Sequence, residues 1–435
     1  MIIPHEINKN VLKCYEVPDC CAKNTNQKIR SYDFTEWNKN IPDSLKLFSI
    51  KCIAKHWQDL PIQLDTLLYS DRSILLDYLP MDIPLKLAVM KLHDDYYWER
   101  KYKTFWPKEP YPNRTMPEYF FYKCTESTEY ESESSLISKY RKIGEGSDDR
   151  DSSNGSYSVS TVSFESSKEK SWKQCFIEQY LEETLENLKP EEYDLDMIKD
   201  LVVVCRHFVT TMSLKELQAP KKSSGNIDHI PLNIVTSGLP FLTELSICFK
   251  QKYLRENFSW NAFKVSLQDI KFLGKGLEHC DLYSFRIQNS DIDCVKIKML
   301  VESLMKNKNL KSLDFSHCEI ADEGALTICK LIKKHPTLNK IVLTNNNIGC
   351  AGAKYFAILL CQDDCRLSYL DLKLNRIGEE GGKLITEALV KGGHLLRELC
   401  LAACCLRKSN WSIGKMIAKN NVLQSLDISS NRMGE

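Results

Sequence analysis

Apolar positions recur in a fixed order along the C-terminal half of this chain. The order is L-x-x-L-x-L-x-x-N/C-x-L, where x is mostly polar, and it is seen as LTELSI (242–247), LYSFRIQNSDI (282–292), LKSLDFSHCEI (310–320), LNKIVLTNNNI (338–348), LSYLDLKLNRI (367–377), LRELCLAACCL (396–406) and LQSLDISSNRM (423–433). From Leu282 onward the first leucines lie 28, 28, 29, 29 and 27 residues apart, and only the first interval, of 40 residues, is irregular. This regularity predicts a repeat architecture.

The period indicates leucine-rich repeats of the ribonuclease-inhibitor type, each with a short parallel strand, a turn and a helix. We therefore predict an α/β fold: a ribonuclease-inhibitor-like leucine-rich-repeat horseshoe with a concave parallel sheet and convex helices, preceded by a mainly α-helical N-terminal region. After each strand, a side chain that can bond to neighbouring backbone and form a stacked ladder is expected at Asn346, Asn375 and Asn431, with Cys318 and Cys404 as substitutes.

The segment 338–360 also resembles a phosphate loop, because an apolar strand leads through Gly349 and Gly352 into a helix. However, the chain contains no G-x-x-x-x-G-K-[ST] motif. Small residues recur at the same place in neighbouring units, at Gly324-Ala325, Gly352-Ala353 and Gly381-Gly382. We therefore predict that these glycines serve helix–strand packing and not phosphate binding.

Changes in residue composition and hydrophobic pattern divide the chain into five parts. We predict an irregular N-terminal segment (1–40), a small helical domain (41–124), a Ser-rich, acidic, disordered insert (125–170), a helical region leading into the arc (171–231) and about seven leucine-rich repeats, the last incomplete (232–435). The last unit has a strand and a turn but no helix, so either the chain is shortened or another protein covers that end.

Helices are expected upstream of the repeats. Asp43 and Ser44 are candidate caps for a helix that follows them, and Pro84 precedes another apolar helical pattern. The segment 171–188 places its large apolar residues mostly on one face. The aromatic residues of the small helical domain are expected to form its core: Trp57, Tyr97, Trp98 and Trp106.

In this type of repeat the polar strand positions line the concave face. The central column is predicted to run Ser246, Arg286, Asp314, Val342, Asp371, Cys400 and Asp427, about 4.8 Å apart between neighbouring strands. The candidate protein-binding residues on this face are Arg286, Asp314, Lys340, Val342, Thr344, Tyr369, Asp371, Lys373, Glu398 and Asp427. Reversing the charge of Asp314 or Asp371 is expected to weaken partner binding with little loss of stability. A charge-balanced face that contacts nothing remains the alternative.

Candidate catalytic chemistry is not apparent. His317 and His394 are isolated, and no Ser/His/Asp or Cys/His arrangement emerges, so we expect a protein that is not an enzyme and that needs no cofactor. The sequence DDRDSSNG is a poor calcium loop, because Asn154 stands where glycine is needed and Ser160 where a bidentate glutamate is needed.

The composition limits the partners and the redox environment that we expect for this chain. The chain has 435 residues, 59 basic and 58 acidic, for a net charge of +1, which favours neither nucleic acid nor a membrane surface as the main partner. The N-terminus lacks the charged and apolar regions of a signal peptide. The 18 cysteines are scattered, which indicates reduced thiols, although a zinc site stays open as an alternative.

Two upstream segments carry a more specific signal: LPMDIPLKLAVMKLHDDYYWERKYKTFWP (79–107) and, after the insert, SWKQCFIEQYLEETLENLKPEEYD (171–194). Their order ahead of the repeats resembles the family of T-complex-associated testis-expressed protein 1, also called dynein regulatory complex subunit 5. The Ser-rich insert departs from this pattern.

This resemblance implies a structural role. Members of the family belong to the nexin–dynein regulatory complex, which links doublet microtubules in motile cilia and sperm flagella and helps to regulate dynein-driven sliding. The implied partners are other subunits of the complex, among them another leucine-rich-repeat subunit, with indirect contact to doublet microtubules. The implied location is the axoneme, within the cytoplasm and cytoskeleton, and no catalytic residues carry over.

Two other functions remain open. A short helical segment with LPMDIPLKL and a later tryptophan, ahead of repeats, also resembles an F-box substrate receptor of a ubiquitin ligase. A small-GTPase activator is the second alternative, although no loop at the edge of the arc is singled out for ordering the nucleotide machinery.

Overall fold

The computed structural model describes residues 44–115, 169–188, 194–218, 229–250, 264–362, 364–391, 395–407 and 410–432. The predicted irregular segment 1–40 and nearly all of the predicted insert 125–170 lie outside these residues. The chain separates into two compact units, Met1–Pro80 and Met81–Glu435. The five-part division of the sequence stays a prediction.

The described part of the first unit, from residue 44 on, contains a pair of helices joined through a short 3-10 helix. These elements are α3 (Leu45–Lys55), η3 (Leu64–Thr66) and α4 (Tyr69–Tyr78). The hydroxyl of Ser44 accepts a hydrogen bond from the backbone N–H of Leu47 at 3.2 Å, so the predicted Ser44 cap is confirmed. Trp57 is fully buried in this unit.

In its described residues, the second unit begins with four helices: α5 (Leu85–Lys91), α6 (Asp95–Phe105), α9 (Trp172–Asn187) and α10 (Leu195–Cys205). Phe176 of α9 lies at the centre of an aromatic cluster, with ring centroids 5.4 Å from Trp98, 5.4 Å from Phe105 and 5.1 Å from Trp106. A capping box formed by Ser171 and Gln174 begins α9. Helix α9 therefore joins two segments that are far apart in the sequence.

Two buried lysines bind α9 and α6 to the chain around α5. The ammonium of Lys173 donates to the carbonyl of Val89 at 2.7 Å, and that of Lys101 donates to the carbonyl of Ile83 at 2.8 Å. Burial lowers the pKa of each lysine to about 8. Both ammonium groups also lie within 6 Å of the Trp98 ring centroid, where its π face favours a cation.

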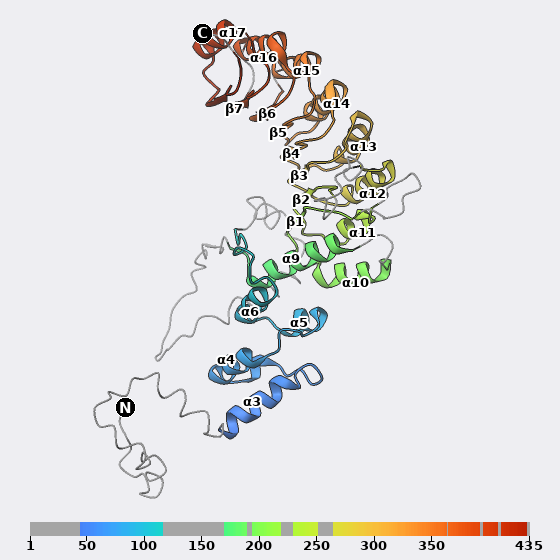
Figure 1. The fold of residues 1–435 in the computed structure, drawn as a ribbon, viewed down its shortest axis with the longest axis vertical. Helices are drawn as coiled ribbons and strands as arrows, with labels where there is room; N and C mark the ends of the chain where they lie inside the picture. The colour runs from blue at the N-terminus through green and yellow to red at the C-terminus, as the bar shows by residue number, and fades with distance from the viewer. Residues whose placement is uncertain are drawn as a thin grey trace, which may run out of the picture. The chain divides into compact units, whose positions relative to one another are not determined.

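The repeats form one parallel sheet of eight strands in sequence order (Figure 1). The strands are β1 (Thr211–Leu214), β2 (Glu244–Ile247), β3 (Ser284–Ile287), β4 (Ser312–Asp314), β5 (Lys340–Val342), β6 (Tyr369–Asp371), β7 (Glu398–Cys400) and β8 (Ser425–Asp427). Seven of them come from the seven predicted repeats. Strand β1 was not predicted, because its surroundings lack the repeated leucine pattern.

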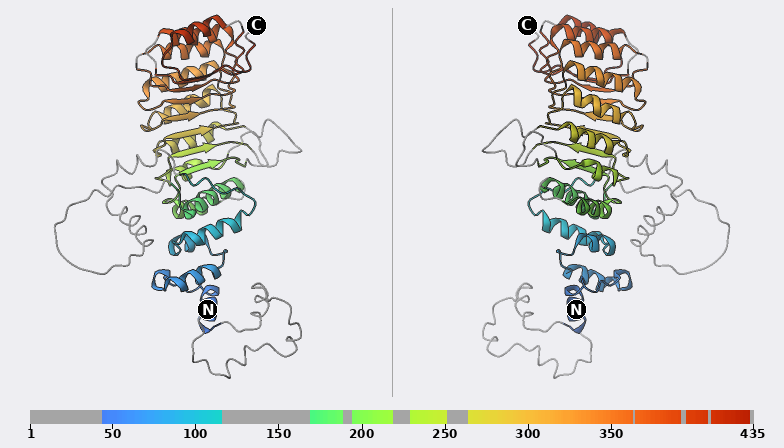
Figure 2. Two further views of the ribbon diagram at one scale, coloured as in Figure 1. Left: turned by 90° about the vertical axis from the view of Figure 1, so that its left-hand side faces the viewer. Right: turned by 90° about the vertical axis from the view of Figure 1, so that its right-hand side faces the viewer.

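Helices cover the opposite side of the sheet (Figure 1) and follow the strands as stacked units (Figure 2). They are α11 (Leu232–Ser237), α12 (Leu267–Leu277), α13 (Cys294–Leu304), α14 (Ala321–Lys334), α15 (Cys350–Leu360), α16 (Gly378–Lys391) and α17 (Asn410–Lys419). The predicted leucine-rich-repeat fold, with a helical N-terminal region, is confirmed. Among the described residues, no helix has the length and apolar character that crossing a bilayer requires.

The ladder position after each strand explains how neighbouring repeats are held together. The side-chain oxygen of Asn375 accepts from the backbone N–H groups of Asn346 and Ile348 at 2.9 and 3.0 Å, and its amide donates to the carbonyl of Leu343 at 2.7 Å. Cys404 keeps the donating half of this pattern, with its thiol 3.0 Å from the carbonyl of Leu372. The predicted ladder is confirmed, and Ser290 extends it to the third strand by accepting from Phe249 N–H at 3.0 Å.

The segment that resembles a phosphate loop has its helix N-terminus already occupied. One carboxylate oxygen of Asp322, from the preceding repeat, accepts from the backbone N–H groups of Gly349 and Gly352 at 2.7 and 2.8 Å. A Cβ atom on Gly352 would lie 2.5 Å from a methyl group of Ile348 and 2.7 Å from this carboxylate. Gly352 therefore has a packing role, but Asp322 and Ala325 belong to helix α14, so the contact is made with the preceding helix and not with a strand as predicted.

Candidate functional site

The register of the sheet brings the predicted central column together. Its members pair strand by strand in the order Ser246, Arg286, Asp314, Val342, Asp371, Cys400 and Asp427, and β1 adds Ser213 at the start. A flanking column pairs Lys340, Tyr369 and Glu398. The strand residues between the two columns are buried, so both columns face away from the core.

Thr344 and Lys373 lie two residues beyond the central column, in the turn after each strand. Lys373 is exposed and Thr344 is half-buried. The ten predicted site residues thus share one face of the sheet, although their role in binding stays a prediction.

Asp314 differs from the free surface carboxylate that was predicted. Only 8% of the residue is exposed, and one carboxylate oxygen lies 3.1 Å from Arg286 Nε and 2.8 Å from Gln288 Nε2. The other oxygen accepts from the backbone N–H and the hydroxyl of Ser316 at 2.9 and 2.6 Å. Asp314 is therefore not the surface position on which the small expected effect of a charge reversal rested, because three hydrogen bonds and an ion pair would be lost.

The carboxylates of the C-terminal strands remain accessible. Asp371 is half-buried and accepts at Oδ1 from the backbone N–H of Lys373 at 2.8 Å. Asp427 is exposed; its pKa is lowered, first by the hydrogen bond from Ser429 and then by the Cys400 thiol and the charge of Lys373. Asp427 therefore presents a negative charge on this face at neutral pH.

Tyr369 supplies an aromatic surface beside these carboxylates. The ammonium of Lys340 lies 4.7 Å from its ring centroid, which is the geometry of a cation–π contact. Partial burial, with the charges of Asp371, Glu398 and Asp314, raises the pKa of the Tyr369 hydroxyl. The hydroxyl therefore stays protonated and can donate to a partner.

The same face offers little reactive chemistry. Cys400 lies between Asp371 and Asp427 in the central column, and burial raises the pKa of its thiol to about 11, which makes it a poor nucleophile. His317 is exposed, with Nδ1 3.1 Å from the Asn345 amide, while His394 lies outside the described residues. Within the described ranges, no group of three His, Cys, Asp or Glu side chains could hold a metal ion.

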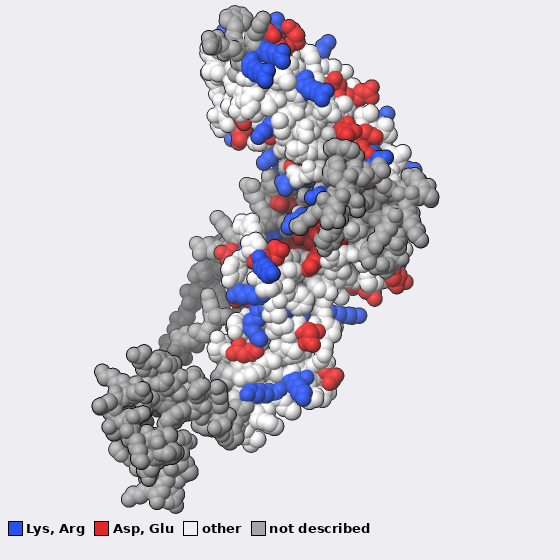
Figure 3. All heavy atoms as spheres, viewed as in Figure 1, with Lys and Arg blue, Asp and Glu red and all other residues white. Residues whose placement is uncertain are grey.

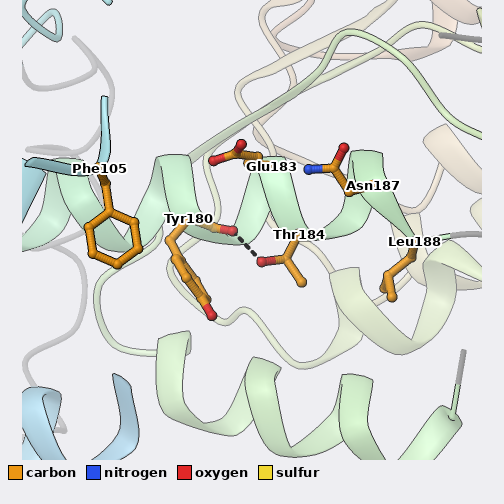
Figure 4. A pocket seen from close by; sticks show the side chains of 6 residues that line it. All are labelled: Phe105, Tyr180, Glu183, Thr184, Asn187 and Leu188. Carbon is orange, nitrogen blue, oxygen red and sulfur yellow. Dashed lines mark hydrogen bonds between the residues drawn. The ribbon is translucent and has the colours of Figure 1, made fainter. Parts of the chain in front are cut away.

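A hollow of about 420 Å³ lies beside α9 and the end of α6 (Figure 4). Two of its polar groups already serve the fold: Glu183 accepts from the Trp106 indole N–H at 2.7 Å, and the Thr184 hydroxyl donates to the Tyr180 carbonyl at 2.7 Å. The remaining lining is contributed by Phe105, Asn187 and Leu188. This mixture indicates packing between helices and not a reaction site.

Charge is mixed on the face of the molecule that Figure 3 shows. There, lysine and arginine are interspersed with aspartate and glutamate. This agrees with the net charge of +1 and favours contacts made by individual side chains over a broad electrostatic field.

One set of residues was missed by the sequence analysis. Glu178, Glu182 and Glu186 project from α9 and accept from backbone N–H groups along strand β1. The signal was present as a spacing of four in the stretch EQYLEETLE, but an exposed helix face shows the same pattern. The role of this spacing is evident only from strand β1, which was not predicted and whose N–H groups donate to the carboxylates.

Comparison with known proteins agrees with this fold. A family model described as "Leucine Rich repeat" matches residues 306–329, 365–385 and 419–434. Dynein regulatory complex subunit 5 of Mus musculus is 27% identical over 324 residues, covering 70% of this chain and 54% of that protein. The same subunit of Macaca fascicularis is 30% identical over 182 residues, covering 37% of this chain and 36% of that protein.

The ribonuclease inhibitor of Mus musculus is also similar, at 29% identity over 160 residues, covering 36% of this chain and 35% of that protein. This match of 160 residues is shorter than the repeat region 232–435. The chain spans about half or less of the length of the regulatory complex subunits, yet its match to the mouse subunit is longer than the repeat region 232–435. The chain is therefore similar to the dynein regulatory complex subunit 5 family of leucine-rich-repeat proteins over more than the repeats.

Proposed function

We propose that this chain is a non-catalytic scaffold subunit of the nexin–dynein regulatory complex in the axoneme of motile cilia and sperm flagella. In this role it contributes to the regulation of dynein-driven sliding through protein–protein contacts of its repeats. The observation that carries the proposal is the match of 324 residues to mouse dynein regulatory complex subunit 5, because many unrelated proteins share repeats but not the upstream helices.

The partner surface in this proposal is the strand side of the sheet over β5–β8. Tyr369 provides an aromatic anchor, and Asp371, Glu398 and Asp427 provide carboxylates around it. Aromatic side chains with satisfied, rigid surroundings are frequent anchors of protein interfaces. The partners are other subunits of the complex, and one of them is another leucine-rich-repeat subunit.

Fractionation of ciliated cells tests the assignment. The protein is expected in detergent-extracted axonemes and is expected to leave them only at high salt. Recovery in the soluble fraction of non-ciliated cells, with none in axonemes, would contradict the scaffold role. Capture of a ligase adaptor and a cullin in place of axonemal proteins would favour the F-box alternative.

The surface itself is tested by pull-down from axonemal extracts. Tyr369→Ala combined with Asp371→Lys is expected to reduce recovery of complex subunits at least tenfold. Glu380→Lys serves as the matched control, because Glu380 is exposed on helix α16 of the same repeat, on the opposite side of the sheet. Equal recovery with both variants would place the contact elsewhere on the chain.

A further inference from the structure

Strand β1 is the first strand of the sheet, so one of its sides has no neighbouring strand among the residues that the structure describes. Helix α9 occupies that side. The backbone N–H groups of Thr211, Ser213 and Lys215 donate to the carboxylates of Glu178, Glu182 and Glu186 at 3.0, 2.5 and 2.7 Å. Three side chains of one helix thus replace the acceptors of a missing strand.

The match depends on a coincidence of two spacings. Four residues of an α-helix rise about 6.0 Å, while two residues of a strand rise about 6.6 Å. Carboxylates four residues apart therefore meet alternate N–H groups of the strand. This arrangement holds α9, and the aromatic cluster around Phe176, against the sheet.

The three carboxylates are not equally compensated. Glu178 has the ammonium of Lys170 at 2.6 Å and two further hydrogen bonds from Thr210. Glu182 lies between the other two carboxylates and receives only the single backbone N–H of Ser213 among the contacts of the described residues. It is therefore the member of the set for which a negative charge is most costly.

The neighbouring elements supply the remaining charges. Lys215, which follows β1, carries a positive charge that lowers the pKa of Glu182. The phenol of Tyr102 on α6 lies close enough to Glu182 for the carboxylate charge to raise the pKa of this phenol. Helix α10 buries Ile198, Val202 and Cys205, of which only the thiol can titrate. Burial of the Glu182 carboxyl away from water, together with the negative charges of Glu178 and Glu186, raises its pKa to about 8.

We infer that the contact between α9 and β1 is a pH-sensitive clamp, which is closed while Glu182 is protonated and opens as this carboxyl ionises. Opening separates α9 from the first strand and so loosens the connection between the helical region and the repeats. The remaining seven strands keep their ladders, because these lie in other repeats.

The direction of the effect follows from proton linkage. The folded pKa of Glu182 is about 8, above the ordinary value of 4.5, so the closed form binds the proton more tightly than the open form. The contribution of Glu182 to the stability of the clamp is full below pH 4.5 and is lost as the pH rises towards 8. The opening constant rises by up to about tenfold per pH unit in this window and levels off above pH 8.

Amide hydrogen exchange of the full chain tests the clamp. Protection of the segment containing β1, corrected for the intrinsic exchange rate, is expected to fall about tenfold between pH 6.5 and 7.5. In Glu182→Gln, which keeps an oxygen acceptor but cannot ionise, the protection is expected to be independent of pH. Glu183→Gln is the matched control, because Glu183 is exposed on the same helix and bonds to Trp106, and it should behave as the wild type.

A glutamine variant with the same pH slope as the wild type would overturn the inference. A second measurement covers the case in which that variant fails to fold. With carboxyl-¹³C glutamate, one signal of the wild-type protein should titrate near pH 8, and it should persist in Glu183→Gln. Titration of every glutamate signal near pH 4.5 would overturn the inference without any variant.

Discussion

Asp314 and Asp371 occupy equivalent positions of the central column, two strands apart, yet their surroundings and roles differ. Asp314 accepts three hydrogen bonds, forms an ion pair with Arg286 and is almost fully buried, whereas Asp371 accepts one hydrogen bond from its own turn and stays half-exposed. The difference arises from the preceding strand, where Arg286 and Gln288 reach Asp314, while Val342 cannot bond to Asp371. An equivalent place in a repeat therefore fixes where a side chain lies but not what it does.

The largest expected effect separates these two carboxylates by stability. Asp314→Lys removes the three hydrogen bonds and the ion pair and sets a second cation beside Arg286, so the free energy of unfolding should fall by about 3 kcal/mol. Asp371→Lys should change it by no more than about 0.5 kcal/mol. Urea denaturation of both variants measures the difference, and equal losses would show that the two positions are equivalent after all.

A smaller effect is expected in the ladder beneath the same strands. Asn375→Cys keeps a donor, as Cys404 does naturally, but leaves the N–H groups of Asn346 and Ile348 without their acceptor. The cost should be about 1–3 kcal/mol. Cys404→Ser, which keeps a donor at a position that already lacks an amide oxygen, is the control and should cost less. A cost of Asn375→Cys below that of the control would mean that the acceptor contributes little.

Close packing under β5 and β6 gives an effect of similar or slightly smaller size. Gly352→Ala forces a methyl group to within 2.5 Å of Ile348 and 2.7 Å of the Asp322 carboxylate. We expect a loss of about 1–2 kcal/mol in thermal unfolding. Gly414→Ala is the matched control, since a Cβ there meets nothing within 4 Å, and a loss no larger than in this control would contradict the packing role.

The smallest expected change in stability concerns the accessible half of the face. Lys340→Met removes the cation above Tyr369 and should cost only about 0.5–1 kcal/mol, because the contact is solvent-exposed. Its effect on capture of complex subunits should nevertheless be measurable if β5–β8 form the partner surface. Loss of stability without loss of capture would confine this pair to folding.

The sequence predicted more of the fold than of the site. The period of 28 or 29 residues located seven strands and the columns on their outer face, because each strand leucine must be buried in the same way. It did not predict the burial of Asp314, since Gln288 and Arg286 act on it from the preceding repeat. It also missed β1, whose TMSL segment carries no repeat signature.

The sequence by itself thus determined the repeating part of this protein: the strands, the apolar core, the ladder side chains and the recurrence of small residues at the start of the helices. These features depend on residues within one period, and the same local pattern solves the same packing problem each time. The tertiary structure decided which helix N-terminus is closed by Asp322, which carboxylate of the column is buried and how α9 covers the free side of β1. Each of these depends on groups that are 26 to 33 residues apart in the chain and that meet only after folding, when removal from water makes their hydrogen bonds and charges decisive.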